Sequence, residues 1–145
     1  MNIAVSVDER IGFAQALVES LRRRGHEVIP QGALRDGKHA DWARVSESAA
    51  RLVAYGQADQ AIVCCWTGTG ASMAANKVPG IRAALCWDAE TARGARRWNQ
   101  ANVLALSLRF TTQAVMEEIL DAWFDTRASA DEADERSVSY LNEIH

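Results

Sequence analysis

The stretch that decides the fold of this chain is Ala61 to Lys77, which reads A-I-V-C-C-W-T-G-T-G-A-S-M-A-A-N-K. Its first part, Ala61 to Cys65, is apolar and typical of a buried parallel strand. The glycines that follow predict a tight loop, and the alanine-rich run from Ala71 predicts the first turns of a helix. A strand, a glycine loop and a helix N-terminus in this order predict an anion site, because backbone N–H groups can approach a ligand there.

Cys65 stands at the end of the predicted strand. A thiol beside an array of N–H donors can become a thiolate and act as a base or a nucleophile. The same pattern also fits a buried strand cysteine beside a turn, and the glycine spacing does not separate the two interpretations. Cys64 is expected to point the opposite way into the core, because side chains alternate along a strand.

Length and composition indicate one domain with a core of its own, because the chain has 145 residues and 48% of them are hydrophobic. The net charge of −3 argues against non-specific nucleic-acid binding. Three cysteines make no disulfide framework, and no spacing suggests zinc for the scattered His26, His39 and His145. Neither a signal peptide nor a membrane-spanning run is evident, so we expect a cytoplasmic protein without membrane partners.

Strand patterns alternate with helix patterns along the chain. The expected strands cover residues 3–7, 27–30, 61–65, 81–87 and 102–106, with a polar loop at 31–39. Asp88 is expected to cap the helix after the fourth strand, and Thr111 or Thr112 the helix after the fifth. This alternation predicts a three-layer, doubly wound, Rossmann-like α/β fold with a five-stranded parallel sheet and a C-terminal helical extension.

The C-terminal segment differs from the rest of the chain. We expect residues 1–124 to form the α/β domain and residues 125–145 to form a polar tail followed by a short helix. Val138, Leu141 and Ile144 would give that helix an apolar stripe. Such a stripe needs a partner subunit to cover it, or it folds back on its own domain.

Two motifs resemble the type B ribose-5-phosphate isomerase and galactose-6-phosphate isomerase family. The run from Cys65 to Leu85 is similar to the family's Cys-Gly-Thr-Gly-x-Gly loop and its A-A-N-K-x-x-G-I-R-A continuation. The run W98-N-Q-A-N-V-L-A-L106, followed by Arg109, is similar to the family's His-Asn-x-x-Asn-Val-Leu pattern with an arginine shortly after. The resemblance covers most of the chain, from Met1 to about Trp123.

This resemblance implies an aldose–ketose isomerase that acts on a sugar or sugar phosphate through a cis-enediolate, with no metal or organic cofactor. It also implies a homodimer or homotetramer whose active site lies at the subunit interface, with Asn99 supplied by the neighbouring subunit. The catalytic residues would be Cys65, as the base, and Thr67. The substrate-binding residues would be Asp8, Glu9, Trp66, Gly68, Thr69, Gly70, Trp98, Asn99 and Arg109.

The chain also departs from the family pattern. Glu9 stands where the family has a histidine after Asp8, and Trp66 replaces the first loop glycine. Trp98 falls on the family's ring-opening histidine, so another group such as Glu9 must open the ring, or the substrate arrives open. The family's C-terminal arginine pair has no clear match. These departures predict a changed substrate, and a non-catalytic sugar-binding or interaction protein with the same fold stays open as the second function.

Overall fold

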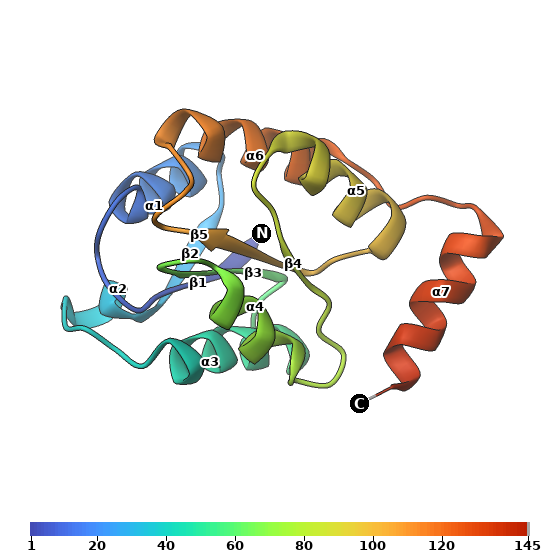
Figure 1. Ribbon diagram of the computed structural model, residues 1–145, viewed down its shortest axis with the longest axis horizontal. Helices are drawn as coiled ribbons and strands as arrows, with labels where there is room; N and C mark the ends of the chain where they lie inside the picture. Colours follow the sequence, from blue (N-terminus) through green and yellow to red (C-terminus); the bar gives the residue numbers. More distant parts are fainter. Residues whose placement is uncertain (145) are drawn as a thin grey trace.

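Five parallel strands form the central sheet of the computed structural model, which describes residues 1–144 (Figure 1). His145, one of the three histidines considered above, lies outside the described residues. The strand order is β2-β1-β3-β5-β4. The strands are β1 (Asn2–Val7), β2 (Glu27–Gly32), β3 (Gln60–Cys65), β4 (Ala83–Leu85) and β5 (Val103–Ser107).

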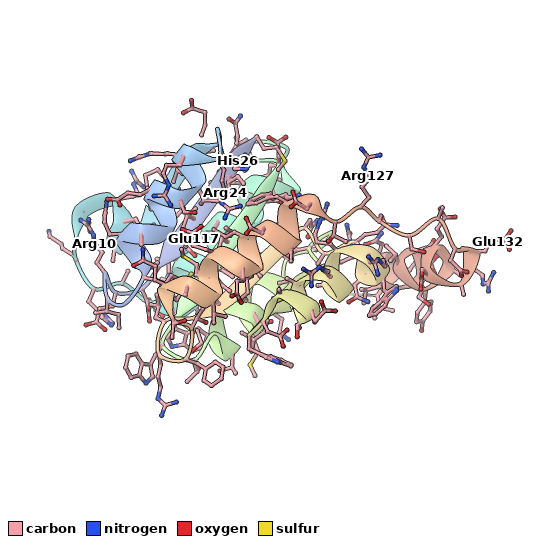
Figure 2. The ribbon with its side chains drawn as sticks, turned by 90° about the horizontal axis from the view of Figure 1, so that it is seen from above. Arg10, Arg24, His26, Glu117, Arg127 and Glu132 are labelled. Carbon is pink, nitrogen blue, oxygen red and sulfur yellow. The ribbon has the colours of Figure 1, made fainter. Side chains whose placement is uncertain are left out.

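Helices cover both faces of this sheet, so the predicted three-layer α/β fold is confirmed. In Figure 1 one layer lies above the sheet and holds α1 (Ala14–Arg23), α5 (Ala89–Asn99) and α6 (Gln113–Asp125). The layer below holds α3 (Trp42–Ala54) and α4 (Thr69–Asn76). Figure 2 shows Arg24, at the end of α1, beside Glu117 of α6, and the guanidinium donates to that carboxylate over 2.8 Å.

The sheet separates two cores, because successive side chains of each strand point to opposite faces. Cys64 packs with Ile62 and the large apolar residues of the upper layer. Cys65 packs with Val63 and the alanines of α3 and α4. The prediction that the two adjacent cysteines point in opposite directions is therefore confirmed.

Two predicted elements were wrong in extent. Residues 31–39 are not only a loop, because β2 continues to Gly32 and the short helix α2 (Ala33–Asp36) follows, with Ala33 fully buried. The strand expected at 81–87 is only Ala83–Leu85. It is an edge strand that pairs with β5 alone, and the N–H of Arg82 donates to the side-chain oxygen of Asn102 instead. Asp88 and Thr112 cap α5 and α6 as expected.

The C-terminal helix α7 (Glu132–Glu143) stands to one side of the domain (Figure 1, right). It begins within the segment expected to be a polar tail, because Asp131 caps it. Of the predicted stripe, Val138 is buried, whereas Leu141 and Ile144 are 43% and 53% exposed. The Val138 side chain is thus covered by other residues of the same chain, whereas the rest of the stripe remains exposed to solvent. No helix within residues 1–144 is long and apolar enough to cross a membrane.

Candidate active site

Three polar side chains lie in a row at the carboxyl edge of the sheet. The register pairs Val7 with Cys64, which places Asp8 beside Cys65 on the neighbouring strand, and it pairs Cys65 with Ser107 on the other side. Neighbouring strands are about 4.8 Å apart. Asp8 and Cys65 are 8% and 5% exposed. The thiol therefore stands between a carboxyl group and a hydroxyl group at the place where open α/β sheets bind ligands.

Hydrogen bonds from the segment that follows β5 hold the backbone of Cys65 and of the next residue, Trp66. The N–H of Leu108 donates to the carbonyl oxygen of Cys65, and that of Arg109 donates to Trp66, both over 3.0 Å. The hydroxyl of Ser107 donates to the same Trp66 oxygen over 2.9 Å. Ser107 was missed in the sequence, although its position at the carboxyl end of a predicted strand was a usable signal.

The glycine loop then turns sharply into α4. Gly68 has a φ of +78°, and a Cβ there would lie 2.6 Å from the Leu85 side chain and 2.9 Å from the Leu106 backbone. Only glycine fits this position. Within residues 1–144, the backbone N–H groups from Thr67 to Ala71 donate to no acceptor. These free donors, at the positive end of the α4 dipole, are what the anion site predicted for this loop requires.

Thr67 and Thr69 stand on the exposed side of this loop, and their hydroxyl oxygens are 2.7 Å apart. Thr67 also borders a cavity of about 430 Å³ at the carboxyl ends of β4 and β5. Arg109 supplies a cation to this cavity, and Trp87 and Phe110 supply aromatic surface. A ligand bound at the glycine loop would have room to extend into this cavity.

Trp42, at the start of α3, packs against Gly70 in the first turn of α4. A Cβ on Gly70 would lie 2.8 Å from the Cε3 atom of this indole and 2.9 Å from Cζ3. The indole thereby covers one flank of the helix N-terminus that carries the free N–H groups. The sequence alone does not predict this contact, because it depends on how α3 packs on α4.

Asp8 and Glu9 lie at the end of β1. Burial raises the pKa of the Asp8 carboxyl above its ordinary value, while backbone hydrogen bonds and the positive charge of His39 oppose that rise. Glu9 is exposed. Asp8 thus lies at the predicted site beside Cys65, and Glu9 follows it toward solvent.

Trp98 and Asn99 lie at the opposite edge of the sheet, because α5 starts at the carboxyl edge and runs back to the amino edge. The indole of Trp98 rests on its own helix, where a Cβ on Gly94 would lie 2.9 Å from it. Asn99 borders a second cavity, of about 580 Å³, formed by residues 76–84 and α7. One chain therefore brings neither Asn99 nor Trp98 to Cys65.

The other two thiols are held in their neutral form. Burial raises the pKa of Cys64 far above its ordinary value and that of Cys86 to about 12. Of the three cysteines, only Cys65 stands in the row at the glycine loop. Within residues 1–144 no group of three or more histidine, cysteine or acidic side chains is placed to bind a metal ion.

Comparison with known proteins identifies the family. The sequence profile described as Ribose/Galactose Isomerase matches residues 3–141. The chain belongs to this family. The resemblance seen in the sequence and the enzyme class it implied, an aldose–ketose isomerase, are confirmed.

Individual relatives agree in length and fold. Galactose-6-phosphate isomerase subunit LacB of Clostridium acetobutylicum is 36% identical over 145 residues, which cover 99% of this chain and 83% of that protein. D-erythrulose-4-phosphate isomerase of Pectobacterium atrosepticum is 32% identical over 126 residues, 86% of this chain and 83% of that protein. The solved ribose-5-phosphate isomerase B of Clostridium thermocellum superimposes with a TM-score of 0.90 at 34% identity, covering 99% of this chain and 96% of that one.

The contact between Trp42 and Gly70 generates a prediction. Gly70→Ala should lower the free energy of unfolding by about 1–3 kcal/mol and reduce kcat/KM, because the new methyl group overpacks the site and displaces the loop. In a Trp42→Ala background the same change should cost much less, since the indole is gone. Urea unfolding and steady-state kinetics of the four proteins give the coupling free energy. Tyr55→Ala, at the far end of α3, is the control, and strictly additive effects would contradict the prediction.

Proposed function

We propose that this enzyme isomerises an aldose and a ketose with Cys65 as the base. One observation carries the proposal: the Cys65 side chain stands beside Asp8 at the start of a loop whose N–H groups are free. A base and an array of donors are the two parts that proton transfer next to a carbonyl group needs. The non-catalytic alternative is not favoured, since a sugar-binding protein would need the donors but not the thiol.

The reaction follows from these positions. The Cys65 thiolate removes the proton from C2 of the aldose, and the electrons move onto the carbonyl oxygen at C1. Backbone N–H groups from Trp66 to Gly70 stabilise the cis-enediolate while a proton moves between the two oxygens. Cys65 then returns its proton to C1, which gives the ketose. The Thr67 hydroxyl orients the thiol or the sugar, and Asp8 binds sugar hydroxyls.

We propose a substrate other than ribose 5-phosphate. The family's C-terminal arginine pair has no clear match in the chain, and within residues 1–144 Arg109 is the one cation bordering the 430 Å³ cavity. A tetrose phosphate is one candidate, because four carbons with a phosphate on O4 cannot form the usual furanose. The relative named D-erythrulose-4-phosphate isomerase supports this candidate. The other is an unphosphorylated sugar or sugar acid that Arg109 binds and a tryptophan stacks against.

We also propose a homodimer or homotetramer in which the neighbouring subunit supplies Asn99 and Trp98. The support is their position at the far edge from Cys65 and the apolar surface around them: Met73, Leu141 and Ile144 border the same cavity as Asn99 and are exposed. A cytoplasmic location is proposed as well, because all three cysteines are free thiols, as expected in a reducing compartment.

Cys65→Ala should abolish turnover while the fold survives. Base catalysis alone is typically worth about 10²–10⁴-fold, and the loss should be at least that large. The measurement is exchange of the C1 or C2 proton with solvent deuterium, followed by NMR. Cys64→Ala is the matched control, because that thiol lies on the opposite face of the sheet and its loss should cost mainly packing. Near-normal exchange in Cys65→Ala would rule out the assignment.

Asn99 should act across the subunit interface. Cys65→Ala and Asn99→Ala chains, each of low activity, should regain activity when unfolded and refolded together. Half of the randomly paired dimers would hold one intact site, so about a quarter of the wild-type activity should return. Cys65→Ala mixed with Thr67→Ala is the control and should recover nothing, because both residues lie at the same edge of one chain. A lack of recovery in the first mixture, or an active monomer by light scattering, would contradict the shared site.

Ribose 5-phosphate should be a poor substrate. Phosphate recognition is weakened without the charge-assisted hydrogen bonds of the missing arginine pair. Steady-state kinetics on phosphorylated and free four-, five- and six-carbon sugars measures the preference. The prediction is wrong if ribose 5-phosphate gives the highest kcat/KM, in the range of about 10⁴ M⁻¹s⁻¹ or more that is usual for enzymes.

A further inference from the structure

His39 lies beside the candidate site in the loop between α2 and α3. The N–H of Ala40 donates to the backbone carbonyl oxygen of Asp8 over 2.8 Å, so this loop is attached to the end of β1. His39 is exposed, whereas the Asp8 side chain is almost fully buried. The imidazole is near enough for its positive charge to counteract the burial effect on the pKa of Asp8. Within residues 1–144 no salt bridge or side-chain hydrogen bond joins these two residues.

The three groups follow one another across the carboxyl edge of the sheet. Cys65 ends β3, Asp8 follows the adjacent strand β1, and the His39 loop is attached at Asp8 on the side of β2. Strand spacing puts Val7, the residue before Asp8, about 4.8 Å from Cys64 of β3. His39 also borders a cavity of about 580 Å³ together with Arg35 and Lys38. A sugar ring whose reacting carbons face Cys65 could thus place its anomeric hydroxyl and ring oxygen toward Asp8 and the His39 loop, while its remote end extends toward the cavity beside Thr67.

A ring-opening group must give and take a proton near neutral pH, and imidazole is the side chain suited to that task. Trp98 cannot perform it, because an indole has one donor and no usable base. Glu9 is exposed and borders neither the cavity beside His39 nor the cavity beside Thr67. His26, the other histidine within residues 1–144, packs on Phe124 with ring centroids 4.5 Å apart and lies 3.2 Å from the N-terminal amine. It has no place at the carboxyl edge.

We propose that His39, acting with Asp8, opens the ring of a cyclic sugar substrate before isomerisation; this rests on the proposed function. The anomeric hydroxyl gives its proton to the Asp8 carboxylate, and a lone pair of its oxygen forms the new C=O bond. The bond between the anomeric carbon and the ring oxygen breaks, its electron pair stays on the ring oxygen, and that oxygen takes a proton from His39. A proton then passes from Asp8 to His39 through water, which restores both groups.

The first test compares cyclic with open-chain substrates. Ribose 5-phosphate, galactose 6-phosphate, ribose and galactose form rings, and erythrose 4-phosphate does not form the usual furanose. His39→Gln should lower kcat/KM by about 10²-fold on the ring-forming sugars that the wild type converts and leave erythrose 4-phosphate unchanged. His26→Gln is the matched control. Neither it nor Glu9→Gln should change the ratio of kcat/KM between the ring-forming sugars and erythrose 4-phosphate. An equal fall in kcat/KM on both classes of sugar would show a structural role for His39 and overturn the proposal. The proposal is also overturned if His39→Gln causes no fall, or if the wild type converts erythrose 4-phosphate alone.

The second test isolates ring opening from isomerisation. In a Cys65→Ala background, exchange NMR should show the enzyme accelerating interconversion of the two anomers of a ring-forming sugar from the first test. Adding His39→Gln should return the rate to that without enzyme, whereas adding His26→Gln should not. Acceleration that survives His39→Gln, or is absent from Cys65→Ala alone, overturns the proposal. Failure of the proposed isomerase function is distinguishable from failure of the His39 proposal, because in the first case the wild type would catalyse no deuterium exchange with any sugar.

Discussion

The position of β3 between β1 and β5 is the constraint on which the candidate site depends. Pairing on both sides fixes the register, so the end of β3 delivers Cys65 to the same level as Asp8 and Ser107. A shift of one residue would turn Cys65 into the upper core and bring Cys64 to the glycine loop. The cluster around Cys64 contains large side chains such as Trp123 and Met116, whereas the cluster around Cys65 is mostly alanine and valine, and this difference in volume makes the alternative register costly.

The free N–H groups of the glycine loop depend on the contacts behind it. The carbonyl oxygens of Cys65 and Trp66 accept hydrogen bonds from the segment after β5, so the loop cannot rotate to satisfy its own donors. Leu85 and Leu106 fill the space behind Gly68, and Trp42 fills the space beside Gly70. These neighbours hold the donors in place before a ligand arrives, and donors fixed in advance need no reorganisation during the reaction.

Local patterns were enough to predict the sheet and the glycine loop, because each strand is a short apolar run and the glycines allow one kind of turn. They could not predict the contacts between distant segments. The packing of Trp42 on Gly70, the hydrogen bond of Ser107 and the position of His39 depend on how separate elements meet. Strand β4 was predicted too long because apolar residues continue past its last ladder pair, and α2 was missed because one helical turn has almost no periodicity.

The exposed aromatic and aliphatic side chains divide between the two ends of the sheet. Trp66, Trp87 and Phe110 lie at the carboxyl edge, and Trp98 and Met73 lie toward the amino edge near α7; each is at least half exposed. Surfaces of this kind are rarely left open on a monomer. In the proposed homodimer a two-fold axis would make every contact occur twice, so docking the amino edge of one chain on the carboxyl edge of its partner would cover both surfaces of both chains. The same operation would bring Asn99 of one chain toward Cys65 of the other, so the exposed apolar residues and the divided site favour the same proposed arrangement.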